Sequence, residues 1–370
     1  TDFTAGDYGW RTPTPVNYSN ALGLAVAHSA THVYERGPNL VQRASYAQSI
    51  LTLTEDVLAL ELRDDQWDGR GWVDLQNSGA GYAGPPSELQ VGNRLNIEFG
   101  YYTVTGNRSS RGPDWFIEAL EYRRKGGVSV LRLHVRSWWW QLRNSRQRTQ
   151  IVNSGTLRAT ITQIVKRAGG LTIHNFTSTR VGSISPKFTI HPTTTGYEAL
   201  RQAFALIADR IVWKANGEAW LIEALAADTT DYTLGADHPV YEHALRTEPV
   251  PVSEAQAVSV AASAQVAGWA TNYAHAEKGM GTQAQVRDVT STSAATIQAT
   301  ATAHLRQRQL DQRAGRIVCP PVCGLELLDC VDISDGYVSV SAQLRRVMGI
   351  TWKFDRGANV YEQELALGPV

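Results

Sequence analysis

Apolar and polar residues alternate strictly in three segments of the chain, at residues 56–64, 92–102 and 128–136. A period of two is typical of a β-strand with one buried face, because successive side chains of a strand point to opposite sides. Turn-rich sequence such as QNSGAGYAGPPSE separates the segments, which favours a barrel or sandwich. The predicted buried faces carry Leu58, Leu60 and Leu62 in the first segment, Leu95, Ile97, Phe99 and Tyr101 in the second, and Leu131, Leu133 and Val135 in the third.

The pattern changes to a helical period between residues 150 and 230. Leu157, Ile161 and Ile164 follow a 3.6-residue repeat that stops at a Gly-Gly pair. Thr195 and Glu198 form a T-x-x-E capping box before a second amphipathic helix. An Asn-Gly pair at 216–217 then predicts a hairpin between two alternating strands. The middle of the chain is therefore predicted to be α+β.

The remaining segments are β-rich or irregular. Residues 250–370 return to alternation, ending in YEQELALG, with one polar, Ala-rich helix predicted at about 293–313. Residues 1–45 read as an N-terminal arm rich in Gly, Pro, Thr and Asn, in which residues 21–28 could hold a short helix or strand. The fold class predicted from these patterns is α+β and mostly β.

Composition narrows the classes of function. The chain has 370 residues, 43% hydrophobic and 19% charged, which suits a folded protein of two or three domains. Lys+Arg and Asp+Glu are both 35, so the net charge is zero, which argues against nucleic-acid binding as the main task and favours self-association. The longest apolar runs fall far short of the ~20 residues that span a bilayer, so no membrane span is expected.

Candidate metal sites are weak. His28 and His32 have the spacing of two helical ligands, but Ser29 stands where a zinc hydrolase needs Glu, and we interpret them as surface or packing histidines. Asp64, Asp68 and Gly69 match part of a calcium loop. Gln66 at its third position and Leu75 at its twelfth do not fit, and a turn with Asp68-Gly69 at its tip is the favoured interpretation.

The cysteine spacing and the search for catalytic motifs also give no sign of a metal site or an active site. Cys319, Cys323 and Cys330 lack zinc-site spacing and are read as reduced structural or incidental thiols. The sequence contains no G-x-S-x-G, phosphate-binding glycine loop or H-E-x-x-H motif. We therefore expect no enzyme activity, no metal and no cofactor. RRKGG at 123–127 is interpreted as a charged hairpin tip.

Three consecutive tryptophans, Trp138, Trp139 and Trp140, follow the strand at 128–136. If the strand continues, Trp139 is in phase with Leu133 and should enter the core of the first β-domain. Trp138 and Trp140 then lie on the opposite face, and large rings on a polar face usually mark something that covers them. We expect these two at a seam between domains or subunits.

The order of the segments resembles that of the tail hub proteins of bacteriophages and related injection systems, the group that includes the baseplate hub of phage Mu. The resemblance covers roughly residues 46–370 and rests on segment order and short phrases. Those phrases are LQVGNRLNIEFGY, WFIEALEY, RLHVRSWWWQLRN, GTLRATITQIVKRAGG, FTIHPTTTGYEALRQAFALI, DYTLGADHPVYEH, PPVCGLELLDCVDIS and MGITWKFDRGANVYEQELALG.

The resemblance implies two β-barrels, each similar to a tail-tube protein, with smaller α+β domains between them. The first barrel would be residues 46–142, the α+β inserts 143–249, and the second barrel 250–370 with its inserted helix. Three chains would then give six barrels, so that a homotrimeric hub matches a sixfold tail tube and encloses the channel for DNA.

The resemblance further implies a structural virion protein at the phage tail tip, assembled in the host cytoplasm. Its partners would be a distal tail or tail-tube protein on one side and a tail-tip fibre or spike protein on the other. A tape-measure protein would lie in the channel, and DNA would be present only in transit. We expect the channel lining to be acidic or neutral, because basic side chains would retain phosphates.

Two alternatives remain open at this stage. The 11 Trp and 14 Tyr would suit a carbohydrate- or receptor-binding tail protein, since sugar faces stack on aromatic rings. A hydrolase of the cell envelope is the other, although its usual nucleophile and metal motifs are absent.

Overall fold

The computed structural model describes most of the chain from residue 22 onward. The described residues are 22–28, 32–36, 40–44, 49–52, 57–77, 89–103, 106–125, 127–146, 150–152, 155–169, 173–177, 180–186, 189–214, 217–235, 238–245, 252–259, 266–273, 283–289, 293–336 and 340–370. The fold class over these residues is α+β and mostly β, as the sequence patterns predicted.

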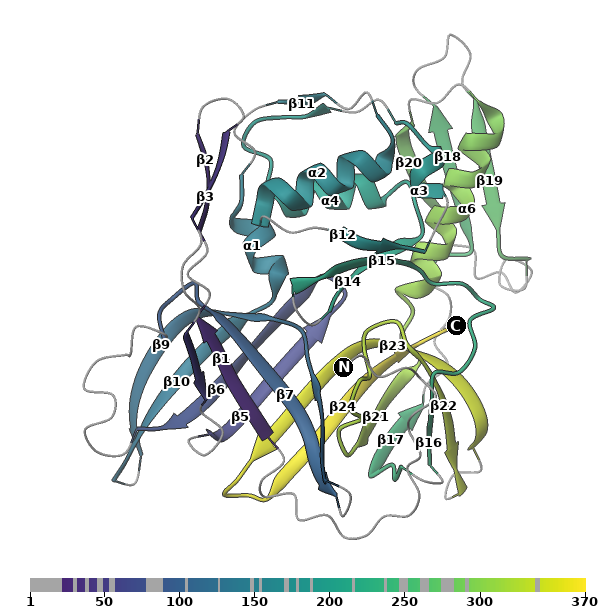
Figure 1. The fold of residues 1–370 in the computed structure, drawn as a ribbon. Helices are drawn as coiled ribbons and strands as arrows, with labels where there is room; N and C mark the ends of the chain where they lie inside the picture. Colours follow the sequence, from purple (N-terminus) through teal and green to yellow (C-terminus); the bar gives the residue numbers. More distant parts are fainter. Residues whose placement is uncertain are drawn as a thin grey trace.

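One large sheet of 14 strands dominates the described part of the chain (Figure 1). Eight of its strands follow one another in the order β17-β21-β24-β23-β5-β6-β10-β9, and we call these eight the shared arc. Their bounds are β17 (Glu242–Leu245), β21 (Gly315–Cys319), β24 (Val360–Gly368), β23 (Val340–Asp355), β5 (Val57–Asp65), β6 (Asp68–Gln76), β10 (Val128–Arg136) and β9 (Trp115–Lys125).

The middle of the shared arc joins two segments far apart in sequence. β5 pairs antiparallel with β23, and Leu62 lies opposite Trp352 in this register. Four strands from before residue 140 therefore continue directly into four strands from after residue 240. The arc has an N-terminal half, β5-β6-β10-β9, and a C-terminal half, β23-β24-β21-β17.

Further strands fold over one face of each half. Beyond β9 the sheet continues into β7, β1 and β4, with β8 on the other edge of β7, and β1 and β7 lie in front of β5, β6 and β10 in Figure 1. On the C-terminal side, β22 pairs with the first part of β23, and β16 pairs with β22. The bounds are β7 (Arg94–Thr103), β1 (Leu22–His28), β4 (Ser49–Thr52), β8 (Gly106–Arg111), β22 (Cys330–Asp335) and β16 (Tyr232–Leu234).

A single apolar core runs under both halves of the arc. Phe99 of β7 stacks on Trp352 of β23, with ring centroids 5.4 Å apart and planes 12° apart. The hydroxyl of Tyr361 on β24 donates to the carbonyl of Gly100 (3.1 Å) and accepts from its N–H (3.0 Å). The two halves are therefore packed and hydrogen-bonded across the core as well as along β5 and β23.

A small α+β unit stands above the N-terminal half (Figure 1). Its three-stranded sheet has the order β12-β15-β14, and its helices pack through an apolar cluster of their own. The predicted capping box is present, with Thr195 and Glu198 bonded reciprocally. The bounds are α1 (Trp138–Asn144), β11 (Ile151–Val152), α2 (Leu157–Gly169), β12 (Ile173–Phe176), α3 (Arg180–Ser183), β13 (Thr189–Ile190), α4 (Gly196–Phe204), β14 (Asp209–Trp213) and β15 (Ala219–Glu223).

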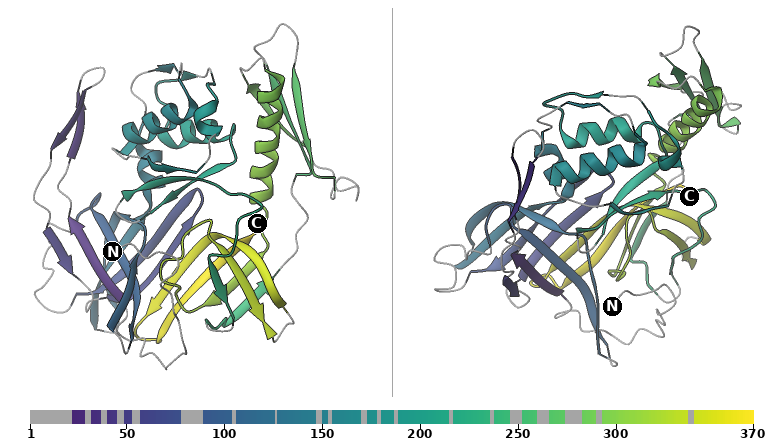
Figure 2. Two further views of the ribbon diagram at one scale, coloured as in Figure 1. Left: turned by 45° about the vertical axis from the view of Figure 1, so that its right-hand side comes forward. Right: turned by 45° about the horizontal axis from the view of Figure 1, so that its top comes forward.

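A third unit consists of helix α6 and a separate three-stranded sheet (Figure 2). Ala255, Ala257 and Ala270 of this sheet pack on Ile297 and Ala301 of the helix. The bounds are β18 (Glu254–Ser259), β19 (Ala267–Thr271), β20 (Gln283–Val289) and α6 (Ala294–Leu310), and a separate hairpin joins β2 (His32–Arg36) to β3 (Leu40–Ala44).

Most of the predicted local structure is confirmed. The buried faces of β7 and β10 are those expected from the alternation, and the alternation expected at the end of the chain is present in β24. On β5, Leu60 and Leu62 are buried, whereas Leu58 is partly exposed because a register irregularity between Val57 and Ala59 interrupts the alternation. Helices α2, α4 and α6 lie where the 3.6-residue period placed them, and β14 and β15 form the predicted hairpin. The cluster RRKGG lies at the β9–β10 connection, but Arg123, Arg124 and Lys125 already pair with β10 as strand residues of β9, so the basic residues are beside the tip rather than at it. Residue 126 lies outside the described residues.

Three expectations differ from the structure. The turn in 64–75 has Gln66 and Trp67 at its tip, not Asp68-Gly69, because Asp65 and Asp68 already pair as strand residues. Part of the predicted arm belongs to the large sheet, where β1 pairs with β7, and residues 1–21 lie outside the described residues. Strands β16 and β17 of the predicted insert join the large sheet, while β18, β19 and β20 of the predicted second barrel do not. Alternation reveals strands but not their long-range partners.

The shared core predicts a cost for removing one oxygen atom. Tyr361→Phe deletes both hydrogen bonds to Gly100 and leaves buried backbone groups without that partner, so we expect the free energy of unfolding to fall by about 1–3 kcal/mol. Urea denaturation followed by tryptophan fluorescence measures the change. Tyr122→Phe is the control, because Tyr122 is 51% exposed. Equal stability of the two variants would mean that this contact does not couple the halves.

Candidate functional site: the polar face of the shared arc

The shared arc has one face on the core and one face covered with charged side chains. On β10, for example, Leu131, Leu133 and Val135 are buried while Arg132 and His134 between them are partly exposed. The same alternation holds on the neighbouring strands. The charged residues of this polar face are Glu61, Arg63, Asp65, Arg70, Asp74, Glu118, Glu121, Arg123, Arg132, His134, Arg136, Glu242, Arg316, Lys353, Asp355, Glu362 and Glu364.

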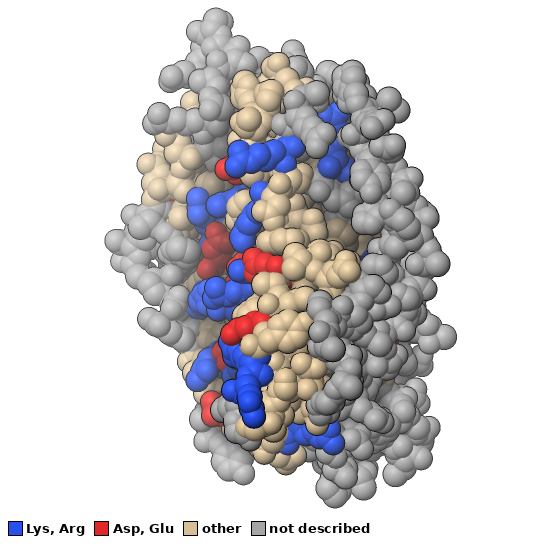
Figure 3. Space-filling model, turned by 90° about the vertical axis from the view of Figure 1, so that its left-hand side faces the viewer, with Lys and Arg blue, Asp and Glu red and all other residues tan. Residues whose placement is uncertain are grey.

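Ion pairs between adjacent strands organise the polar face. Arg132 binds Asp74 through two parallel bonds, Nε to Oδ1 at 2.5 Å and Nη2 to Oδ2 at 2.6 Å. Lys353 lies 3.4 Å from carboxylate oxygens of both Glu362 and Glu364. These side chains are partly buried, and the bidentate Arg132–Asp74 pair has the stronger geometry of the two. The paired groups neutralise one another. On the side of the molecule that lies at the left of Figure 1, Figure 3 shows acidic residues interleaved among more extensive basic ones.

The expectation for Trp139 is wrong. The strand ends at Arg136, and α1 begins at Trp138 with Ser137 as its N-cap. Successive helical side chains turn by about 100° rather than 180°, so the strand phase no longer applies. Trp139 is 1% exposed and lies in the core of the α+β unit, with its ring centroid 5.1 Å from Trp67 and 5.3 Å from Trp213.

Trp138 is buried and Trp140 is partly buried. Trp138 is 7% exposed and meets Phe116 of β9 edge-on at 4.4 Å, so it lies between the shared arc and the α+β unit. Trp140 is partly buried against the core of the α+β unit. Sequence reasoning missed the contributions of Trp67 and Trp213 to this aromatic cluster, because they come from other parts of the chain.

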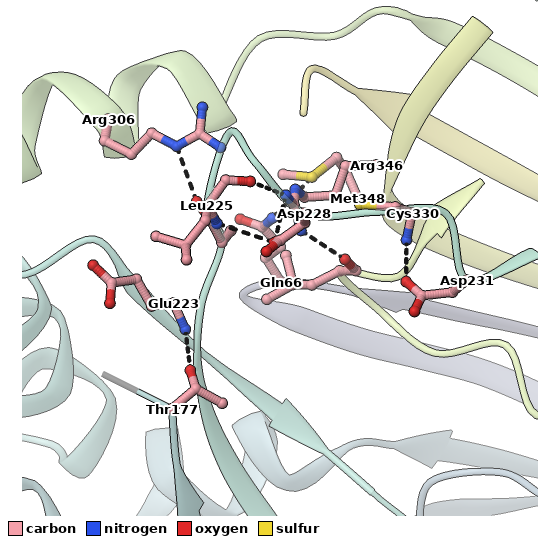
Figure 4. A network of polar contacts seen from close by, with 12 residues as sticks. Gln66, Thr177, Glu223, Leu225, Asp228, Asp231, Arg306, Cys330, Arg346 and Met348 are labelled. Carbon is pink, nitrogen blue, oxygen red and sulfur yellow. Dashed lines mark hydrogen bonds and ion pairs between the residues drawn. The ribbon is translucent and has the colours of Figure 1, made fainter. Parts of the chain in front are cut away.

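A buried arginine connects the parts of the molecule (Figure 4). Arg346 of β23 is 1% exposed. Its guanidinium donates to the carbonyl oxygens of Leu225 (2.7 Å) and Leu328 (2.8 Å) and to Oδ2 of Asp228 (2.8 Å). Leu225 and Asp228 belong to the segment that leads from β15 of the α+β unit to β16 of the large sheet. Arg346 therefore fixes this connection to the shared arc.

The same connection is held from two further sides. Arg306 of α6 donates from Nε to the carbonyl of Ala224 (3.0 Å), and Asp231 accepts from the N–H of Cys330 (2.8 Å). Helix α6 also contacts the α+β unit directly, since Arg210 donates to the carbonyl of Gln307 (3.2 Å). The three units thus meet at one polar junction.

Burial raises the pKa of several groups. Desolvation raises the pKa of Asp329 to about 8, and it raises that of Asp64, which is 3% exposed, well above the usual range. The same cause raises the pKa of Cys319 and Cys323 to about 12 and that of Cys330 to about 11. These thiols stay protonated near neutral pH, which makes them poor nucleophiles and agrees with their reading as buried structural residues.

The described residues contain no cluster of three or more His, Cys, Asp or Glu side chains arranged to hold a metal ion. His28 ends β1 and His32 begins β2, so the two do not share a helix; their side chains lie outside the described part. Asp64 faces the core whereas Asp68 pairs with Arg143 at 2.8 Å. No helix within the described ranges is both long and apolar enough to cross a membrane.

The junction predicts a large cost for one substitution. Arg346→Met removes three hydrogen bonds and leaves the carbonyls of Leu225 and Leu328 without this donor, so we expect a loss of about 3 kcal/mol in the free energy of unfolding. Arg345→Met, on the next residue and only partly buried, is the matched control. The result is read by thermal and urea denaturation. A loss no greater than that of the control would contradict the assigned role.

Asp329 predicts a pH dependence with a defined sign. The pKa of Asp329 is about 8 in the folded chain and near 4 when unfolded, so the folded state binds the proton more tightly. Its contribution therefore destabilises the fold progressively as pH rises from about 4 to about 8. We expect Asp329→Asn to reduce this slope and to be more stable than wild type at pH 8. Asp65→Asn makes the same charge change on the polar face and should not alter the slope of stability against pH in this way. The prediction is refuted if Asp329→Asn has the same slope as the wild-type chain.

Comparisons with known proteins place the fold. No protein-family model matches the sequence, and no curated protein matches it. Among solved structures, the tail protein from Neisseria meningitidis MC58 superposes with a TM-score of 0.64 at 11% identity, over 94% of this chain and 96% of that one. The 43 kDa tail protein of prophage MuSo2 from Shewanella oneidensis gives 0.60 at 11% identity, over 94% and 97%.

A third solved structure extends the likeness beyond phages. The E. coli c3393 protein, described as a component of the type VI secretion system, gives a TM-score of 0.50 at 12% identity, over 85% of this chain and 74% of that one. At these identities the likeness concerns the fold. The chain thus has the fold of phage tail proteins and of related secretion-system proteins, which confirms at the level of the fold the resemblance drawn from its sequence.

Proposed function

We propose that this chain is a structural tail protein that forms a trimeric hub at the tail tip or baseplate. The observation that carries the proposal is the shared arc, in which two four-stranded halves form one continuous sheet. Three chains would supply six such halves. A threefold assembly of this kind has the repeat needed to meet a sixfold tail tube, and closure into a ring would also cover the edge of the sheet at β17.

The polar face of the arc suits the lining of the resulting channel. Its carboxylates slightly outnumber its guanidinium and ammonium groups, and most of the basic groups are paired with neighbouring acids. Affinity for DNA depends on unpaired cations that displace counterions from phosphates. A face whose charges are already balanced would let DNA pass without holding it. This agrees with the expectation of a neutral or acidic lining.

The finer details of the proposal come from the resemblance. The hub would meet a distal tail or tail-tube protein on one side and a fibre or spike protein on the other, with a tape-measure protein in the channel. Its location would be the virion tail tip. The structural similarity of the E. coli c3393 protein to the T4 bacteriophage tail proteins gp27 and gp5 supports an assembly of this type.

The alternative of a carbohydrate-binding tail protein rests on the 11 Trp and 14 Tyr of the chain. Of the three consecutive tryptophans, Trp138 and Trp139 are buried and Trp140 is partly buried, so this run does not form an open stacking platform. Each makes its contacts with Phe116, Trp213 or the core of the α+β unit. We therefore favour the structural role, in which no enzymatic activity is required.

The oligomeric state tests the proposal. Native mass spectrometry of the purified chain should show a trimer, and electron microscopy should show a ring with threefold symmetry. The trimer should bind DNA weakly in a filter assay at physiological salt. A chain that stays monomeric at high concentration and in tail assemblies would sink the proposal, and so would tight retention of DNA.

A further inference from the structure

Three arginines lie side by side on the polar face. Arg63 of β5 is the register partner of Arg70 of β6, and Arg70 is the register partner of Arg136 of β10. Like charges directly opposite one another on adjacent strands are destabilising. The rest of the polar face instead places acids beside bases. This row of three arginines therefore departs from the acid–base pairing of the rest of the face, and it does not stabilise the fold.

The three arginines differ in their partners. Arg136 donates from Nε to Glu118 at 2.6 Å, and Arg63 has a looser contact with Asp65 at 3.6 Å. Within the described part of the chain, Arg70 has neither an ion pair nor a side-chain hydrogen bond, and it is exposed. The central guanidinium of the row is thus open to a ligand in trans.

The row also borders a hollow in the surface. A pocket across β5, β6, β10 and β9 is lined by the three arginines together with Glu61, Trp72 and Glu118. Trp72 supports one wall, since the guanidinium of Arg132 lies 4.0 Å above its ring. The arginines therefore line a shallow, open hollow.

We propose that this arginine groove binds carboxylate side chains of an acidic protein segment. Guanidinium groups form two parallel bonds with a carboxylate, and the bond pair between Arg132 and Asp74 on the same face shows that geometry. Arg70, flanked by Arg63 and Arg136, offers the same fork without a partner. An Asp or Glu side chain from another protein would complete the pattern of the face.

The acids of the groove favour a peptide over nucleic acid. Glu61 and Glu118 line the pocket together with the three arginines and His134, so with the histidine neutral the lining has a formal net charge of +1. Duplex DNA carries a phosphate about every 1.7 Å along its axis. Its closely spaced charges would meet Glu61 and Glu118, whereas single carboxylates of a peptide can be placed on Arg70 alone.

The position of the arginine groove on the polar face indicates which protein would carry the acidic segment. If the polar face lines the channel, the acidic segment belongs to a protein threaded through that channel, and this part of the inference rests on the proposed function. Binding of an acidic peptide does not depend on the trimer. A chain that binds the peptide but never forms a ring would refute the hub and leave the arginine groove standing.

The experiment uses the full chain and a fluorescein-labelled peptide of alternating Glu and Ser. Fluorescence anisotropy should show binding, and Arg70→Gln should weaken it about tenfold, the loss expected for one charge-assisted contact. Arg124→Gln is the matched control, because Arg124 is also exposed but lies near the β9–β10 hairpin. Arg70→Gln should unfold at the same temperature as wild type or higher, because it relieves like-charge repulsion.

Competition experiments distinguish carboxylate ligands from phosphate ligands. A peptide with Gln in place of Glu should not compete, and neither inorganic phosphate nor a single-stranded oligonucleotide of equal charge should displace the acidic peptide efficiently. Unchanged binding by Arg70→Gln would overturn the proposal, as would an equal loss in Arg124→Gln. Stronger competition by phosphate or the oligonucleotide would assign the groove to phosphate groups and overturn it as well.

Discussion

The pairing of β5 with β23 is the constraint on which the rest of the structure depends. The register extends from Ala59 opposite Asp355 to Asp65 opposite Gly349, so the two halves of the arc are joined along most of β5. Separating the two halves would break these backbone hydrogen bonds and expose β5 and β23 as unpaired sheet edges. The N-terminal and C-terminal strands therefore behave as one sheet over one core.

Strand β23 carries a second connection on the same backbone. Its first part pairs with β22 and its later part with β24 and β5, so it passes from one layer of the fold to the other. Arg346 stands where the two parts meet and reaches the segment that leaves the α+β unit. The position of that unit above the arc is thus tied to the strand that joins the two halves.

The register of the arc also decides the chemistry of its outer face. Asp74 opposite Arg132 gives a paired charge, whereas Arg70 between Arg63 and Arg136 gives a row of like charges. Both arise from the same alternation of inward apolar and outward charged residues. A neutral face with one basic groove fits the proposed role of this face, which would let most polyanions pass and hold an acidic segment.

The sequence by itself determined the local elements: the buried faces of β7 and β10, the capping box at Thr195 and the hairpin at 216–217, because each depends on neighbours in the chain. It also supported the resemblance to tail hub proteins. Tertiary structure alone decided that Trp139 belongs to the α+β core, that β16 and β17 join the large sheet, and that Arg63, Arg70 and Arg136 are neighbours. The start of helix α1 at Trp138 sets the place of Trp139, and strand pairing over long separations sets the other two contacts. Alternation within a strand does not identify the strand that pairs with it.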